Sequence, residues 1–277
     1  MKSHKNKTYA IADNVDRHKL YELSVQNAES EIDFVDKTYQ EKRNKAATLL
    51  REDFCGTANV CCEWVKRRKE NLAIGVDLDT EVLDWSKKFK VGKLPKKQLD
   101  RVQLIEENVL AVKTKKVDII SAMNFSYWLL KEPQLLTDYF KNVAKSLKDD
   151  GIFFLDAFGG YDAFREIEEE REIEDDEMDF SYIWDQTKFD PITNELNCSI
   201  HFEFEDGSRM QDAFVYDWRL WTLPEIKTLL LNAGFKKVTF YWQGFDEDEE
   251  EDGDFQPVKA GEVDADAGWI CYITAEK

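Results

Sequence analysis

Apolar and polar residues follow one pattern through the first half of the chain. From about residue 46 to residue 156, short apolar runs alternate with longer amphipathic stretches, which is typical of a parallel sheet with helices on both faces. The expected strands are 48–50, 72–77, 101–105, 117–121 and 151–156, and the expected helices are 60–69, 80–89 and 135–147. The pattern therefore predicts an α/β fold.

The pattern changes after residue 156. Residues 164–177 are acidic and predict a helix, and residues 180–189, 195–205 and 210–220 are aromatic-rich runs with a period of two, separated by turn signals. We expect an antiparallel β meander inserted into the α/β series. The series then resumes with a helix over 224–232, ended by Gly234, and with strands at 238–242 and 269–274. The whole predicts a seven-stranded, mostly parallel, Rossmann-like sheet with a terminal antiparallel hairpin strand.

The net charge of -19 comes from two segments rather than from the whole chain. Residues 166–179 hold ten acidic residues and residues 246–254 hold eight; the remaining chain has 39 acidic and 37 basic residues. Each segment fits a solvated helix face or loop. Each also fits a surface that repels nucleic acid and attracts a cationic substrate or partner. We expect no nucleic-acid partner.

The remaining composition excludes several classes of site. Five cysteines lack a CxxC pair and three histidines lack ligand spacing, so we expect neither a disulfide framework nor a metal site. The first residues are polar, and no run approaches the roughly 18 apolar residues that cross a bilayer. We therefore expect a cytoplasmic protein with no membrane contact.

The strongest chemical signal lies at the end of the first expected strand. Cys55-Gly56-Thr57-Ala58 forms a small-residue turn before a helix, where backbone N–H groups can approach a polar ligand. Asp77 ends the next strand, where a carboxylate can accept hydrogen bonds from ribose hydroxyls. Together they predict a nucleotide-like cofactor at this edge of the sheet.

Residues 52–58, Glu-Asp-Phe-Cys-Gly-Thr-Ala, resemble the first motif of class I S-adenosylmethionine-dependent methyltransferases, commonly D-L-G-C-G-T-G. In that alignment Glu52 takes the acidic place and Gly56 the central glycine, while Phe54 and Ala58 stand where glycines are usual. The longer string from Leu50 to Ala58 is similar to a little-characterised branch of these enzymes. The resemblance implies S-adenosylmethionine as cofactor, bound by residues that include Arg51, Glu52, Cys55, Gly56 and Thr57.

The resemblance continues in order over residues 46–277. It implies that Asp77 binds the ribose, that Leu78 packs on the adenine, that Asn108 meets the adenine amino group, and that Val109 lies near the ring. Asn124 follows the fourth strand, at the motif that faces the methyl group.

Asn124 and Tyr127 are therefore the candidates for catalysis, by positioning the acceptor, with Phe125 and Trp128 either as walls of the site or as packing under the sheet. Residues 124–127 are also similar to the Asn-Pro-Pro-Tyr motif of enzymes that methylate planar nitrogens, without its two prolines. Methyl transfer from a sulfonium is an in-line displacement, which mainly needs alignment and the exclusion of water.

Three functions remain open. The first is methyl transfer to a small molecule at nitrogen or oxygen, with residues 1–45 as a helical lid and residues 161–220, inserted in the domain 46–277, as a substrate roof. Residues 16–22 also fit a plain amphipathic helix packed on the sheet. The second is methylation of a basic protein. The third is a binding module that retains the fold without turnover. The sequence predicts no oligomeric state.

Overall fold

The structure is a computed structural model, and it describes residues 10–176, 178–245 and 251–277. The chain forms two compact units: a larger one of Asn27–Ala163 with Arg219–Lys277, and a smaller one of residues 10–26 with Phe164–Trp218. Of the segment 1–45, which we expected as one lid, residues 10–26 belong to the smaller unit and residues 27–45 to the larger one.

The larger unit contains an eight-stranded sheet in the order β11-β10-β12-β5-β4-β1-β2-β3. Its strands are β1 (Leu49–Asp53), β2 (Leu72–Asp77), β3 (Val102–Glu106), β4 (Val117–Ala122), β5 (Leu147–Gly159), β10 (Lys237–Phe245), β11 (Glu251–Val258) and β12 (Trp269–Glu276). The first five run parallel, and β12 pairs antiparallel with β5. The predicted α/β fold with a mostly parallel sheet is confirmed, and β11 adds an eighth strand.

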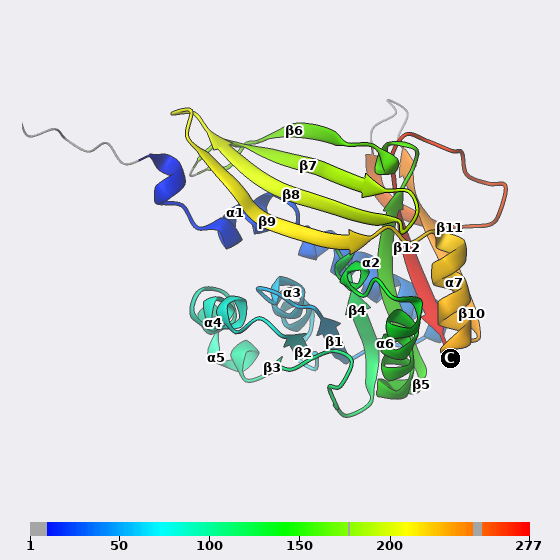
Figure 1. Ribbon diagram of the computed structural model, residues 1–277. Coiled ribbons are helices and arrows are strands. Elements are labelled where there is room, and N and C mark those ends of the chain that lie inside the picture. Colours follow the sequence, from blue (N-terminus) through cyan, green and yellow to red (C-terminus); the bar gives the residue numbers. More distant parts are fainter. Residues whose placement is uncertain (1–9, 177, 246–250) are drawn as a thin grey trace, which may run out of the picture. The chain divides into compact units, whose positions relative to one another are not determined.

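Helices cover both faces of this sheet. They are α2 (Ala28–Arg43), α3 (Asn59–Arg67), α4 (Thr80–Phe89), α5 (Lys96–Leu99), α6 (Pro133–Ser146) and α7 (Leu223–Asn232), with 3-10 turns η2 (Val91–Lys93) and η3 (Ser126–Leu129). In one buried cluster, Ile32 of α2 and Trp64 of α3 pack with Leu50 of β1. Helices α6 and α7 lie side by side (Figure 1). No helix among the described residues is long and apolar enough to cross a membrane.

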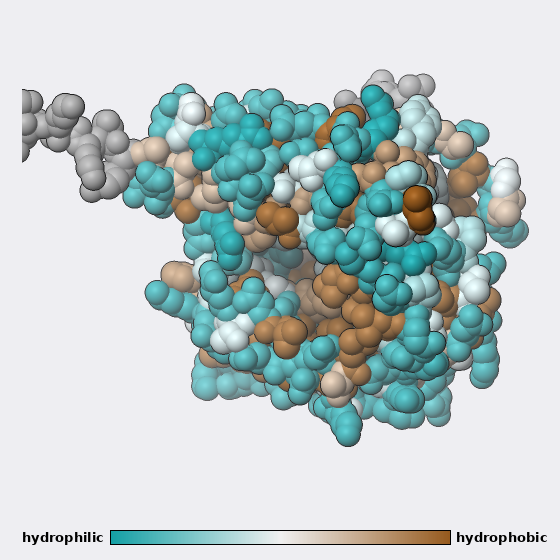
Figure 2. All heavy atoms as spheres, in the orientation of Figure 1, coloured by the Kyte–Doolittle hydropathy of each residue, from teal (hydrophilic) through white to brown (hydrophobic). Residues whose placement is uncertain are grey.

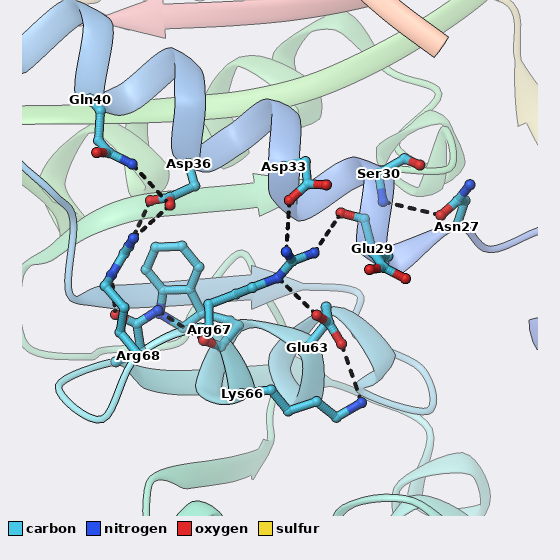
Figure 3. A network of polar contacts seen from close by, with 12 residues as sticks. Asn27, Glu29, Ser30, Asp33, Asp36, Gln40, Glu63, Lys66, Arg67 and Arg68 are labelled. Atoms are coloured by element: carbon cyan, nitrogen blue, oxygen red, sulfur yellow. Dashed lines mark hydrogen bonds and ion pairs between the residues drawn. The ribbon is translucent and has the colours of Figure 1, made fainter.

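Polar networks fix α2 against α3, and Figure 3 shows these contacts. The Asn27 side chain caps α2 by accepting a hydrogen bond from the Ser30 N–H at 3.1 Å. Arg67 pairs with Asp33 at 2.9 Å, and Arg68 forms two 2.6 Å bonds with Asp36. Because Arg67, the last residue of α3, and Arg68, directly after it, bind successive turns of α2, these contacts fix α2 against α3.

The smaller unit is built on a four-stranded antiparallel sheet. Its elements are η1 (Ile11–Asp13), α1 (Arg17–Ser24), β6 (Ile167–Ile173), β7 (Phe180–Asp190), β8 (Glu195–Phe204) and β9 (Arg209–Arg219), and η4 (Asp162–Phe164) precedes β6. Leu20 of α1 packs in a buried cluster with Phe180 and Phe202. This sheet contains the three strands that alternation predicted.

The helix expected over residues 164–177 is wrong, because residues 167–173 form strand β6. Glutamate favours helices, but pairing with β7 overrides that local preference. Strand β6 is at the edge of its sheet, where exposed carboxylates such as Glu169 discourage pairing with another chain.

The second acidic segment, 246–254, fits a solvated helix face or a loop by its sequence. Residues 246–250 lie outside the described residues, and the backbone from Glu251 onward belongs to β11. For residues 251–254, the expectation of a helix or loop is therefore corrected to a strand.

Charged and polar side chains cover most of the face shown in Figure 2. Apolar side chains gather on it over η3 and the start of α6, where Leu129 is 49% exposed and Leu135 38% exposed. This apolar surface belongs to the segment that follows β4, and β4 ends at the candidate site described next.

Candidate cofactor and acceptor site

The strand order places a ligand crevice at the end of β1. Strand β1 lies between β2 and β4, so the connections after β1 and after β4 leave the sheet in opposite directions. In open parallel sheets, ligands bind at the carboxyl ends of the strands where the order reverses in this way. The turns after β1, β2, β4 and β5 are therefore the first place to look for chemistry.

The turn after β1 has the backbone of a glycine-rich loop without all of its glycines. Phe54, Gly56 and Ala58 have φ angles of 56°, 51° and 60°, in the left-handed region. These are the three positions of the glycines in the resembled motif. A left-handed conformation costs a residue other than glycine roughly 1–2 kcal/mol. The two replaced glycines therefore leave the path of the turn unchanged, at a cost in strain.

Asp77 ties this turn to β2. Its Oδ2 accepts the Gly56 N–H at 2.7 Å, and its Oδ1 accepts the Asp79 N–H at 2.9 Å. The Cys55 N–H donates to the Val76 carbonyl at 3.0 Å, and a Cβ on Gly75 would lie 2.9 Å from the Cys55 sulfur. Asp77 and the turn are thus held together, as the sequence predicted.

The other residues predicted to bind the cofactor lie around the same edge. Leu78 is 65% exposed and free to contact a ring, whereas Val109 is buried. Asn108 Oδ1 accepts the Leu110 N–H at 2.9 Å, which fixes the orientation of its amide. Thr57 is buried, and its carbonyl accepts the Ser86 hydroxyl at 2.5 Å.

Arg51 cannot bind the cofactor in this conformation, which corrects our expectation. Its side chain is fully buried and forms a two-pronged ion pair with Asp53, at 2.8 and 2.9 Å. Asp53 also accepts the Tyr139 hydroxyl of α6 at 2.9 Å. Arg51 therefore holds Asp53 within β1, and Asp53 links this strand to α6 inside the core.

Tyr127 is likewise placed in the core rather than at the surface of the turn. It is fully buried, and its hydroxyl donates to the Asp156 carbonyl at 2.7 Å. Trp128 is buried too, and its ring centroid lies 4.7 Å from that of Phe158. The ring centroids of Phe158 and Phe125 are 4.8 Å apart. These contacts favour packing for Trp128, and they argue against direct contact between Tyr127 and an acceptor.

Asn124 stands among three buried carboxylates. Its N–H donates to Asp156 Oδ2 at 2.7 Å, and its side-chain amide lies 3.5 Å from Glu31 Oε1. Asp156 also accepts the Phe125 N–H at 2.9 Å. Glu52 accepts the Cys61 N–H at 2.9 Å. Among the described residues, no basic side chain bonds to any of the three carboxylates.

Burial changes the acidity of this group. It raises the pKa of Glu31 from 4.5 to about 8, with further contributions from the charges of Asp156 and Glu52. Burial also raises the pKa of Glu52 to about 8 and that of Asp156 to about 7. A cation brought to this site would lower all three pKa values by favouring the ionised carboxylates.

Glu31→Gln is expected to stabilise the ligand-free protein at pH 8. Unfolded Glu31 ionises above pH 4.5, whereas folded Glu31 keeps its proton up to about pH 8, so wild-type stability falls as pH rises through that window. Glutamine has no such penalty but leaves a buried polar atom unpaired, so we expect a net gain of about 1–2 kcal/mol.

Urea unfolding of both proteins at several pH values measures this difference. The gain should vanish below pH 4.5, where Glu31 becomes protonated in the unfolded state as well as in the folded state. A gain that does not depend on pH would show that Glu31 is not the titrating group.

Sequence reasoning missed Glu31 and Asp156. Glu31 falls within the apolar stripe of α2 formed by Ala28, Ile32 and Val35, and a charged residue in such a stripe is the signal that could have found it. Asp156 is the last residue of an expected strand, as Asp77 is. The argument from the carboxyl end of a strand, which identified Asp77, could therefore have found Asp156 as well.

A separate group in the smaller unit has the spacing of metal ligands. Ligand atoms of Glu168, Asp185 and His201 lie within 4.8 Å of one another. However, His201 Nδ1 accepts the Asp212 N–H at 2.8 Å, so the neutral ring carries its proton on Nε2, 3.4 Å from Asp185. A metal would need the lone pair at Nε2. Hydrogen bonding within the sheet explains this group.

Comparison with known protein families bears on the function of this edge of the larger sheet. Residues 53–155, which run from the end of β1 to β5, match the family described as "Methyltransferase domain". This segment is a methyltransferase domain. One solved structure of similar fold holds bound S-adenosylmethionine. No curated protein matches the chain.

Solved structures extend the likeness from this domain to nearly the whole chain. An S-adenosylmethionine-dependent methyltransferase from Clostridium acetobutylicum is 17% identical, with a TM-score of 0.65 over 94% of this chain and 98% of that one. An amino pentose methyltransferase from Micromonospora echinaspora, involved in calicheamicin biosynthesis, is 12% identical, with a TM-score of 0.67 over 99% and 100%. A sugar N-methyltransferase from a Streptoalloteichus species is 13% identical, with a TM-score of 0.64 over 100% and 99%.

Proposed function

We propose that this chain is an S-adenosylmethionine-dependent methyltransferase that acts on a small molecule and methylates a nitrogen or oxygen atom. The observation that carries the proposal is that its fold is shared, over nearly the whole of both chains, with enzymes described as acting on an amino pentose and on a sugar. The likeness includes the smaller unit as well as the domain that holds the cofactor.

The cofactor in this proposal lies along the turn after β1. Each oxygen of Asp77 accepts one backbone N–H, and a carboxylate oxygen can accept two, which leaves capacity for the ribose hydroxyls. Leu78 and Val109 would flank the adenine and Asn108 would meet its amino group, while Glu52 and the Gly56 turn would hold the methionine end. The hydrogen-bond donors and acceptors of these residues fit S-adenosylmethionine.

The cofactor supplies a methyl group on a sulfonium, which is a good leaving group. The residues of this chain therefore have to align the acceptor and exclude water. Asn124 follows β4 and is half-buried, with its backbone fixed by Asp156. We propose that Asn124 positions the acceptor and that Tyr127 supports the same turn from inside the core.

Incubation with methyl-labelled S-adenosylmethionine and a cell extract, separated into small molecules and macromolecules, tests this proposal. We expect label in the small-molecule fraction, at a rate that barely changes with ionic strength. Added S-adenosylhomocysteine should suppress the transfer and serves as the control.

Methylation of a basic protein is the second candidate, because β6 exposes a row of carboxylates, Glu168–Glu170. Label in macromolecules, at a rate that falls steeply with added salt, would support this candidate instead of the first.

A further inference from the structure

One oxygen of a buried glutamate at the acceptor side of the site has no partner. Glu31 is only 5% exposed, and among the described residues no donor bonds to its Oε2. Its Oε1 has only the 3.5 Å contact with the Asn124 amide, which is long for a hydrogen bond. Leaving a buried carboxylate so poorly satisfied is costly, unless a ligand completes it.

We propose that the acceptor is a primary or secondary amine that arrives as an ammonium ion, and that the Glu31 carboxylate binds this ion and takes its proton. The proposal rests on the proposed function, since it names the acceptor class of the same site. The Glu31 carboxylate would then exchange its long contact with the Asn124 amide for a shorter, charge-assisted hydrogen bond from the ammonium group.

The groups around Glu31 favour a cation. Asp156 of β5 and Glu52 of β1 both act on Glu31 as negative charges, and Tyr272 of β12 lies close enough for its own pKa to be raised by Glu31 and Asp156, after burial. Asn124 is the only group within hydrogen-bond distance of the Glu31 carboxylate in the described chain. The carboxyl groups of Glu31, Asp156 and Glu52 would repel a substrate that carries a carboxylate, whereas they would attract an ammonium ion.

Helix α2 holds Glu31 in a fixed position. Asp33 and Asp36 of the same helix pair with Arg67 and Arg68 at the end of α3 (Figure 3). Glu31 is thus on a helix held by ion pairs rather than on a loop. A base that must meet its substrate in a defined geometry needs such a fixed position.

The chemistry of an amine acceptor requires a proton acceptor. An ammonium nitrogen has no lone pair, so one N–H bond must break, with the proton passing to a Glu31 oxygen and the electron pair staying on nitrogen. That nitrogen then bonds to the methyl carbon while the carbon–sulfur bond breaks and its electron pair passes to sulfur. The products are a methylated ammonium ion and a neutral thioether, and Glu31 releases its proton to water. A base whose pKa lies near the working pH suits this step.

Chemical blocking of amines in the extract tests the acceptor class. Treatment of the small-molecule fraction with an N-hydroxysuccinimide acetate reagent converts primary and secondary amines to amides and leaves most hydroxyl groups intact. We expect labelling to fall at least about ten-fold, the scale of one lost charged contact. Undiminished labelling would overturn the inference and leave the proposed function standing, whereas no labelling of the untreated fraction would overturn the proposed function itself.

Sinefungin tests the place of Glu31 without knowledge of the acceptor. This cofactor analogue carries an ammonium group where the methyl group would be, whereas S-adenosylhomocysteine carries nothing there. We expect Glu31→Gln to weaken sinefungin binding about ten-fold or more while S-adenosylhomocysteine binding stays unchanged. Glu29→Gln is the matched control, because Glu29 is exposed on the same helix, and it should change neither affinity.

Two results of this titration would overturn the inference. An unchanged preference for sinefungin in Glu31→Gln would show that the carboxylate does not meet the ammonium group. Equal weakening of both ligands would show that Glu31 holds the methionine end of the cofactor instead. Binding of neither ligand by the wild-type protein would count against the proposed function.

Discussion

Replacing Arg51 with methionine is expected to lower the free energy of unfolding by about 3–5 kcal/mol, the usual cost of removing one partner from a buried ion pair. The guanidinium and the Asp53 carboxylate are both fully buried, and within the described part of the chain the variant would leave the Asp53 carboxylate with only the Tyr139 hydroxyl. Methionine fills a similar volume, so the loss reports the unpaired charge rather than a cavity. Chemical denaturation followed by circular dichroism measures it.

The double variant Arg51→Met with Asp53→Asn is the matched control for this prediction. Asparagine is neutral and can still accept the Tyr139 hydroxyl, so most of the lost stability should return. A loss of less than about 1 kcal/mol in the single variant, as for an exposed ion pair, would contradict the buried position of Arg51.

Much of the fold could be predicted because strands and helices of the larger unit have clear periodic patterns. The parallel strands are continuous apolar runs, and Asp77 and Gly56 lie where the connection between strand and helix leaves the sheet. Both were therefore placed correctly from order along the chain alone. Predictions of this kind depend only on local sequence and on the direction of the strands.

The errors arise where distant contacts decide the outcome. Strand β6 has the composition of a helix, and only its pairing with β7 makes it a strand. Arg51 lies next to the cofactor motif in sequence, but alternation along β1 turns its side chain to the α6 face, where Tyr139 meets the same ion pair. Glu31 precedes the motif by about twenty residues, and its place beside Asn124 depends on how α2 packs on the sheet.

Asp77→Ala is expected to weaken cofactor binding by about 10- to 100-fold, or about 1.5–3 kcal/mol, the range for a hydrogen bond to a charged group. The carboxylate has two tasks at this site. It accepts the Gly56 N–H and so shapes the turn, and in our proposal it also accepts the ribose hydroxyls. Alanine removes both, while Asp77 is partly exposed, so the fold should persist.

Calorimetric titration of S-adenosylhomocysteine into the wild-type protein, Asp77→Ala and Asp84→Ala tests the central claim that the turn after β1 is the cofactor site. Asp84 is the matched control, because it is exposed on α4 and, among the described residues, pairs only with Lys87, at 2.8 Å. We predict equal affinity for the wild-type protein and Asp84→Ala, and the loss given above for Asp77→Ala. Equal affinity in all three proteins would place the cofactor elsewhere and contradict the account.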